Sequence, residues 1–124
     1  MKIKLIIYTL LILGLISCNS KNNFAKIKHI DSISLGTIKI NHEVTKIVYI
    51  KNLGNETLIL KGIKASCGCT VIDKYSNNVS SNDSIPVKLK VKPNELGKFS
   101  KNIMIRSNDK KEFTTINILA NVIL

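Results

Sequence analysis

The chain of 124 residues contains no tryptophan, and all of its 19 basic side chains except Arg106 are lysines. Aromatic residues make up only 5% of the sequence. Surfaces that bind nucleic acid usually combine arginines with stacking aromatic rings, so this composition argues against a nucleic-acid partner. The missing tryptophan also argues against an antibody-type domain, in which a tryptophan packs on a disulfide between the sheets.

Motifs of the common catalytic chemistries are absent as well. The histidines, His29 and His42, each lack a second ligand at metal-binding spacing. No nucleophile-elbow pattern and no phosphate-binding loop occurs in the sequence. We therefore predict a protein that is not an enzyme and that needs no cofactor.

The N-terminus lacks an apolar run long enough for a membrane span. Lys2 and Lys4 are followed by 12 mostly apolar residues, 5–16, whereas a spanning helix needs about 20. A basic start and a short apolar run are typical of a signal peptide. The run ends in Leu15-Ile16-Ser17-Cys18, which resembles the bacterial lipobox. This resemblance implies cleavage before Cys18, a diacylglycerol on its sulfur and acylation of the new amine.

These features predict three parts of the chain. Residues 1–17 are a lipoprotein signal peptide, residues 18–26 a lipidated polar tether, and residues 27–124 one folded domain. Two or three acyl chains give stable anchoring where one would be reversible. We expect a location in the bacterial cell envelope, with membrane contact through the lipid on Cys18; the inner and the outer membrane both fit.

The charge of the mature chain is strongly positive. Removing Lys2 and Lys4 from the 19 basic residues leaves 17 against 8 acidic ones, a net charge of +9. A solvated lysine-rich surface explains this charge most simply. A weak attraction to anionic headgroups or acidic polymers is a further expectation.

Nearly all of the mature sequence has the composition of β-strands separated by turns. The predicted strands are 44–51, 58–65, 70–74, 86–92, 99–106 and 113–122, preceded by one or two strands between residues 27 and 40 that break at Gly36. No segment long enough to form a stable helix shows a helical spacing of apolar residues. About seven short strands in roughly 100 residues predict an all-β fold, an immunoglobulin-like β-sandwich, with a small barrel as the alternative.

The run 86–92 shows the clearest alternation. Val87, Leu89 and Val91 fall on one face and three lysines on the other, as in a half-buried strand. Its lysines and leading proline predict an edge strand. From 113–122 we expect Ile116, Ile118, Ala120 and Val122 on the buried face. In the turn 52–56, Gly54 and Asn55 are candidates for positive φ.

A family resemblance covers residues 33–122. It is carried by Leu35-Gly36-Thr37, by Lys51-Asn52-Leu53-Gly54-Asn55 with Leu58, by Ser66-Cys67-Gly68-Cys69-Thr70, by the Lys92-Pro93 turn with Gly97, and by Ser107-Asn108. The pattern resembles domain of unknown function 1573, a bacterial family with an immunoglobulin-like fold that is frequent in lipoproteins. Its most specific part is the Cys-Gly-Cys-Thr element. The resemblance implies a location and an architecture, and it supplies no catalytic residue.

Cys67 and Cys69, separated by Gly68, are the main candidate site. On a straight strand their Cα atoms would lie about 6.6 Å apart, near the upper limit for a disulfide, so Gly68 is predicted to act as a hinge. The pair is then a structural disulfide or packed thiols, a redox-active disulfide, or a two-thiolate site for a soft cation such as Cu(I). An exported location favours oxidation.

Two functions follow from these observations. The first is a membrane-tethered, non-catalytic immunoglobulin-like module that binds an envelope protein or polymer. The second is a thiol-redox or soft-metal-handling lipoprotein that uses Cys67 and Cys69. A histidine beside the pair, or a third cysteine outside the lipobox, would favour the second, and the sequence has neither. We therefore prefer the first, without predicting an oligomeric state.

Overall fold

The computed structural model describes residues 1–13 and 22–124. Lys2–Leu13 form helix α1. Within these two described ranges, no helix combines the length and the apolar character that crossing a membrane requires. Cys18 and the predicted cleavage site lie outside the described residues.

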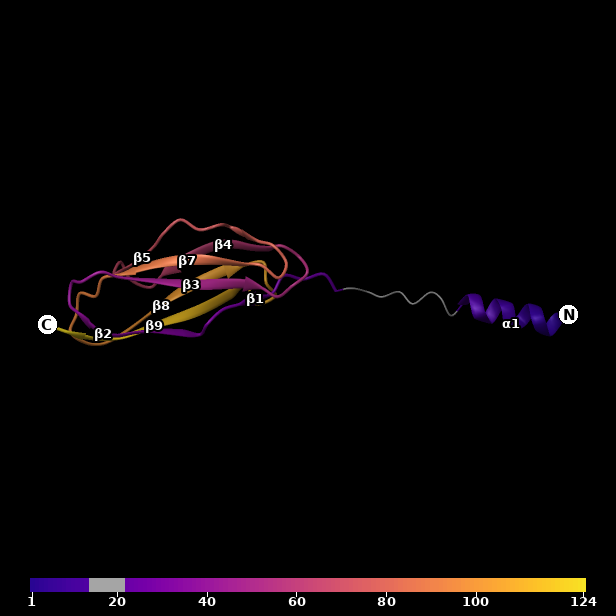
Figure 1. Cartoon of the computed structure of the whole chain (residues 1–124), viewed down its shortest axis with the longest axis horizontal. Helices are drawn as coiled ribbons and strands as arrows, with labels where there is room; N and C mark the ends of the chain where they lie inside the picture. The colour runs from indigo at the N-terminus through magenta and orange to yellow at the C-terminus, as the bar shows by residue number, and fades with distance from the viewer. Residues whose placement is uncertain (14–21) are drawn as a thin grey trace.

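Within residues 22–124 the chain forms two β-sheets that pack face to face (Figure 1). The strands are β1 (Ile27–Lys28), β2 (Ser32–Lys39), β3 (Val44–Asn52), β4 (Leu58–Ala65), β5 (Thr70–Ile72), β6 (Asn78–Val79), β7 (Ser84–Val91), β8 (Gly97–Ser107) and β9 (Phe113–Ile123). One sheet has the order β1-β3-β7-β5 and the other β2-β9-β8-β4-β6. Neighbouring strands are antiparallel except β2 and β9, which run parallel. The predicted all-β sandwich is therefore confirmed.

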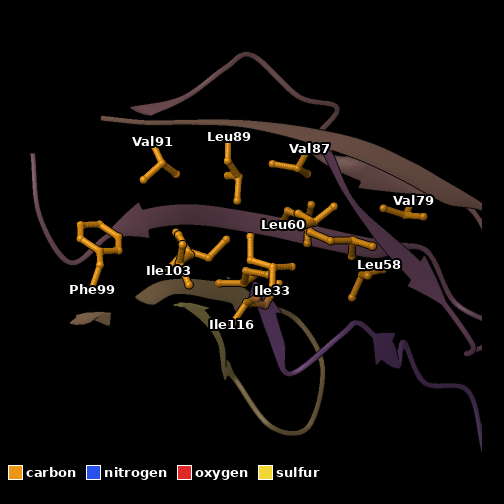
Figure 2. Close-up of a cluster of buried hydrophobic side chains, with 14 of the residues drawn as sticks. Ile33, Leu58, Leu60, Val79, Val87, Leu89, Val91, Phe99, Ile103 and Ile116 are labelled. Carbon is orange, nitrogen blue, oxygen red and sulfur yellow. The ribbon is translucent and has the colours of Figure 1, made fainter. Parts of the chain in front are cut away.

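The core lies between the two sheets and follows the alternation seen in the sequence. Figure 2 shows Val87, Leu89 and Val91 of β7 facing Ile103 and other side chains of the five-stranded sheet. Six of the predicted core residues of β7 and β9 are at most 2% exposed: Val87, Leu89, Val91, Ile116, Ile118 and Val122. The seventh, Ala120, is half-buried and packs against this core. Each of the six side chains contributes about 1.5–3 kcal/mol to the free energy of folding through burial. The predicted register of these strands is correct.

The prediction that strand 86–92 lies at a sheet edge is wrong. β7 is central, with β3 on one side and β5 on the other. Pro86 is tolerated there because β5 has only three residues and pairs with β7 between Leu89 and Val91. Pro86 lies beyond the end of β5, so its missing N–H breaks no pair with that strand.

Two predictions about glycines also need correction. Gly36 does not end a strand: it lies in β2 with φ 68°, at a bulge between Ser34 and Thr37 that shifts the register with β9. Gly54 and Asn55 do not have positive φ; among non-glycine residues described, Asn41 and Asn82 do. Gly54 is needed for another reason. A Cβ atom there would lie 2.7 Å from the Ala25 Cα atom, which is closer than real Cβ contacts.

Asn52 holds the N-terminal segment against the sandwich. Its side chain is fully buried and accepts hydrogen bonds from the amides of Gly54 (2.9 Å) and Lys26 (3.3 Å). The same side chain donates to the carbonyl oxygens of Glu56 (2.6 Å) and Val79 (3.0 Å). A buried amide with all four bonds made stabilises its surroundings, whereas an unpaired one is costly.

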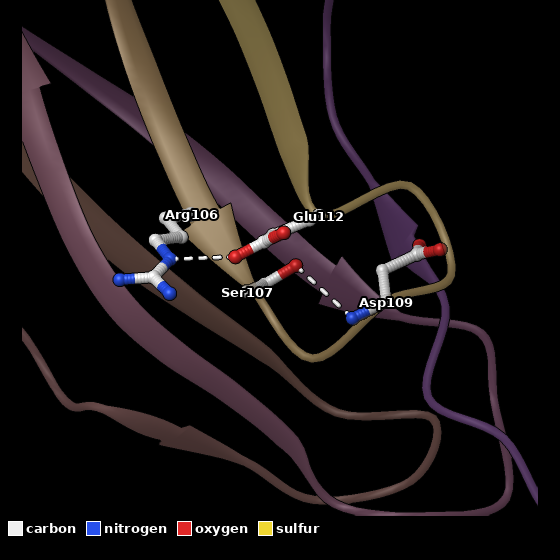
Figure 3. Close-up of polar contacts among 4 residues, drawn as sticks. All are labelled: Arg106, Ser107, Asp109 and Glu112. Atoms are coloured by element: carbon white, nitrogen blue, oxygen red, sulfur yellow. Dashed lines mark hydrogen bonds and ion pairs between the residues drawn. The ribbon is translucent and has the colours of Figure 1, made fainter.

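The loop between β8 and β9 fastens the same segment from the other sheet. The Asp109 carboxylate accepts a hydrogen bond of 2.8 Å from the Ile27 amide at the start of β1. Figure 3 shows how the loop is closed: the Asp109 amide donates to Ser107 Oγ at 3.3 Å, and Arg106 Nε lies 2.8 Å from a carboxylate oxygen of Glu112. Side chains from both sheets therefore fix the point where residues 22–26 join the sandwich.

The sandwich thus has two distinct ends. We call the end built by Asn52, Gly54 and Asp109 the tether end. At the opposite end of β3, Val44 pairs with Val91, which also pairs with Thr70 of β5. We call this the far end. The nine residues of β3 separate the two ends, which at about 3.3 Å per residue is a distance of about 26 Å.

We predict that Asn52→Ala lowers the free energy of unfolding by about 2–4 kcal/mol, because four backbone groups around a fully buried side chain lose their partner. Chemical denaturation followed by circular dichroism measures this loss. The control is Asn121→Ala on the exposed face of β9, expected to change stability by less than about 0.5 kcal/mol. Equal effects of the two substitutions would contradict the role given to Asn52.

Candidate functional site

The Cys67–Cys69 segment lies in one of the connections by which the chain passes from one sheet to the other. β4 ends at Ala65 in the five-stranded sheet, and β5 begins at Thr70 in the four-stranded sheet. The connection lies at the far end, because Thr70 pairs with Val91. The sequence places the pair at a turn after a strand; it does not indicate that the turn joins two sheets.

Hydrogen bonds fasten this connection to both sheets. On the side of β8, the Ser66 amide donates to the Asn102 carbonyl oxygen at 2.8 Å, and the Asn102 amide donates to Ser66 Oγ at 3.0 Å. On the side of β7, the Lys92 amide donates to the Cys69 carbonyl oxygen at 2.8 Å. The turn is therefore a bridge between the ends of two sheets, held in place by its backbone.

Cys67 and Cys69 are joined by a disulfide, with their Cα atoms 5.2 Å apart. The backbone is bent, since two such residues on a straight strand would be about 6.6 Å apart. Both cysteines are half-buried, and Cys69 packs against the core. Whether the disulfide also takes part in redox or metal chemistry stays a prediction. A soft cation would require thiolates, and therefore prior reduction of the bond.

The hinge prediction for Gly68 finds no support in its backbone geometry. Gly68 is exposed, and its φ lies outside the left-handed region that favours glycine. A Cβ atom on it would have no neighbour within 4 Å. The space around Gly68 would accommodate a side chain, so we expect a larger residue there to be compatible with the disulfide.

A surface hollow of about 450 Å³ borders the disulfide. Besides the cysteines and Gly68, it is lined by residues from two neighbouring turns and from strand β8: Asn41, Lys92, Asn94, Glu95 and Lys101. Two lysines against one glutamate make the hollow basic, which would favour a thiolate after reduction of the disulfide. Sequence reasoning missed these residues because they come from three separate segments.

The remaining polar groups do not complete a metal or catalytic site. His29, near the tether end, has its Nδ1 atom 2.8 Å from the Ile30 carbonyl oxygen, and His42 follows Asn41 at the far end. Residues 1–13 and 22–124 contain no group of three or more histidine, cysteine, aspartate or glutamate residues that could hold a metal ion. Thr70, next to the disulfide, has a buried hydroxyl without a hydrogen-bond partner among the described residues.

The two sheets packed face to face define an immunoglobulin-like β-sandwich. The family model described as "Protein of unknown function (DUF1573)" matches residues 26–122, so the chain belongs to this family. The resemblance seen in the sequence is therefore confirmed. No curated protein matches the sequence.

Solved structures with the same fold come from different organisms. A protein of unknown function from Porphyromonas gingivalis W83 has a TM-score of 0.72 and 13% identity, over 86% of this chain and 51% of that one. The Vibrio cholerae VesB protease has a TM-score of 0.65 and 13% identity, over 77% of this chain and 31% of the protease chain. The ASH/PapD-like domain 7 of human CEP192 has a TM-score of 0.62 and 14% identity, over 88% of this chain and 93% of that domain.

The present chain spans about half or less of the first two structures. Identities this low show a shared fold and transfer no activity. The match to the CEP192 domain, which covers nearly all of both chains, supports the immunoglobulin-like and PapD-like architecture.

We predict that replacing both Cys67 and Cys69 with serine leaves the domain folded and lowers the free energy of unfolding by at most about 1.5 kcal/mol. The reason is that a disulfide between residues two apart closes a very small loop, which restricts the unfolded chain little. Ile118→Ala, which empties part of the core, is the comparison and should cost about 2–5 kcal/mol. A double variant that fails to fold at all would contradict this ranking.

Proposed function

We propose that this protein is a membrane-tethered, non-catalytic binding module of the bacterial cell envelope, anchored through lipid on Cys18. The observation that carries the proposal is the opposition of the two ends of the sandwich. The tether joins at Asn52, Gly54 and Asp109, whereas the Cys67–Cys69 turn lies at the far end. A lipid at the N-terminus would therefore hold the far end and the sheet surfaces away from the bilayer.

The fold and the surface features support binding over catalysis. The immunoglobulin-like and PapD-like architecture is found in domains of unrelated proteins. The VesB protease shares it over only 31% of its chain. The hollow beside the disulfide offers two lysines, a glutamate and amide groups, which suit recognition of a polar ligand.

Thiol exchange is the second candidate, favoured by the half-exposed disulfide next to Lys92 and Lys101. In this reaction a thiolate of a dithiol donor attacks one cysteine sulfur, the S–S bond breaks, and the other sulfur leaves as a thiolate. The donor's second thiolate then attacks the donor's own sulfur in this mixed disulfide, and the bound cysteine leaves as a thiolate. The donor becomes a disulfide, and two electrons and two protons pass to Cys67 and Cys69. Alkylation after treatment with graded dithiothreitol measures how readily the pair is reduced.

We predict that Cys18→Ala abolishes lipidation and removes the mature protein from the membrane fraction. The predicted lipid is attached to the Cys18 sulfur, which alanine lacks. Fractionation of cells and mass spectrometry of the purified chain measure location and modification together. The matched control replaces Cys67 and Cys69 with alanine and should leave the protein anchored. A Cys18→Ala variant still cleaved at the same bond and still in the membrane would overturn the anchoring proposal.

A further inference from the structure

One long edge of the four-stranded sheet has no neighbouring strand. β3 pairs along its length with β7, from Val44 to Lys51. On its other side it pairs with β1, and only at Lys51 and Asn52. Within residues 22–124, nothing else adds to this side of β3. The part of β3 from Val44 to Ile50 is therefore an open edge, unlike the three-residue edge strand β5 on the other side of the sheet.

Hydrogen-bond alternation shows which residues face this open edge. The Asn52 amide donates towards β7, to the Asp83 carbonyl oxygen, at 2.9 Å. The next amide, that of Leu53, donates the opposite way, to the Lys26 carbonyl oxygen, at 2.7 Å. Along an antiparallel strand the direction alternates with every residue. The N–H and C=O groups of residues 45, 47 and 49 consequently point out of the sheet edge.

The same three residues expose their side chains on the outer face of the sheet. Ile47 is 46% exposed and Tyr49 61% exposed, large values for apolar and aromatic residues in the middle of a strand. Tyr49 lies opposite Pro86, and Ile47 opposite Lys88, in the register with β7. Ile47 and Pro86 also line a surface hollow of about 440 Å³. Unpaired backbone thus lies next to apolar surface.

Lysines surround the open edge. Lys46 and Lys51 lie on β3 itself and Lys88 on β7, and all three are exposed with no carboxylate within 4.0 Å among the described residues. Lys90 is different, because Asp73 lies 3.4 Å from its ammonium group. Lys46 occupies a position whose alternation points it towards the inner face, where a charge opposes pairing with an ordinary apolar strand.

We propose that the open edge of β3 is a docking site for an extended segment of a partner protein in which apolar residues alternate with acidic ones. The segment pairs antiparallel to β3, in line with β1, and hydrogen-bonds to residues 45, 47 and 49. Its apolar side chains lie beside Ile47 and Tyr49, and an acidic one neutralises Lys46. The inference rests on the proposed function as a binding module and names the chemistry of the partner.

Charge selects this partner over a second copy of the chain. Two copies joined through β3 would each bring Lys46 to the interface, with a net charge of +9 on each mature chain. Neither copy has an acidic residue between Val44 and Asn52 to neutralise it. Like charges across a strand pair are destabilising, whereas an acidic segment is attracted and held in register.

The test uses the full-length mature protein in detergent micelles and a seven-residue probe, Val-Glu-Val-Glu-Val-Glu-Val. Two isomers each carry two backbone N-methyl groups, one isomer on the two interior valines and the other on the last two glutamates. In antiparallel pairing the valine amides face β3, so the first isomer should lose binding at least about tenfold and the second should bind like the parent. Fluorescence anisotropy of a labelled probe measures the affinities. A peptide with lysine for glutamate should bind at least about tenfold more weakly.

Two variants at one position test the protein side. Ile47→Pro removes an amide that faces the open edge and not the β7 pairing, and it should lower the affinity for the parent probe at least about tenfold. Ile47→Thr removes the same apolar side chain but keeps the amide, so it should lower the affinity for the parent probe clearly less than Ile47→Pro does. If Ile47→Pro fails to fold, the two methylated isomers still decide the question on the wild-type protein.

Equal binding of the two isomers, tighter binding of the lysine peptide, or no binding of the parent probe would overturn the edge proposal. Self-association of the protein through residues 45–49, seen by sedimentation, would overturn it in favour of a second copy. None of these results changes the Cys18-dependent anchoring, so the proposed function can stand when the edge proposal fails. If anchoring does not depend on Cys18 but the edge still distinguishes the two isomers, the anchoring proposal fails and the edge proposal stands.

Discussion

The buried side chain of Asn52 is the constraint on which the arrangement of this domain depends. Its four hydrogen bonds join the last residue of β3 to the incoming chain at Lys26, to the following turn and to β6. Because this contact and the close approach at Gly54 fix the chain beside the end of β3, β1 pairs there for only two residues. The chain then crosses to the other sheet as β2, and the rest of β3 stays open.

The Cys67–Cys69 disulfide has a comparable place at the opposite end. It braces the four residues by which the chain passes from β4 to β5, where Ser66 bonds to β8 and Cys69 to the end of β7. The two ends of the sandwich are thus held locally, one by an amide side chain and one by a covalent bond. This explains why a small sandwich without a disulfide between its sheets keeps two well-defined ends.

The sequence was sufficient to predict the strands, the sandwich and the buried faces, because alternation with period two reports directly on burial. It could not reveal that β7 is central, since Pro86 and alternating lysines look the same on an edge strand and beside a short neighbour. The motif residues were visible, but their roles were not: Asn52 and Gly54 act through Lys26 and Ala25, which are distant in sequence. The residues around the disulfide and the open edge likewise depend on strand order, which local patterns do not encode.

The central claim is that β3 is open along residues 45–49 and is held so by the way the chain enters at Asn52. Residue-resolved amide hydrogen exchange of the free protein tests it most directly. The amides of Lys46, Val48 and Ile50, which bond to β7, should exchange slowly, and those of Thr45, Ile47 and Tyr49 should exchange fast. Uniform protection along β3 would contradict the claim, because it would mean that another strand or a second molecule already covers this edge.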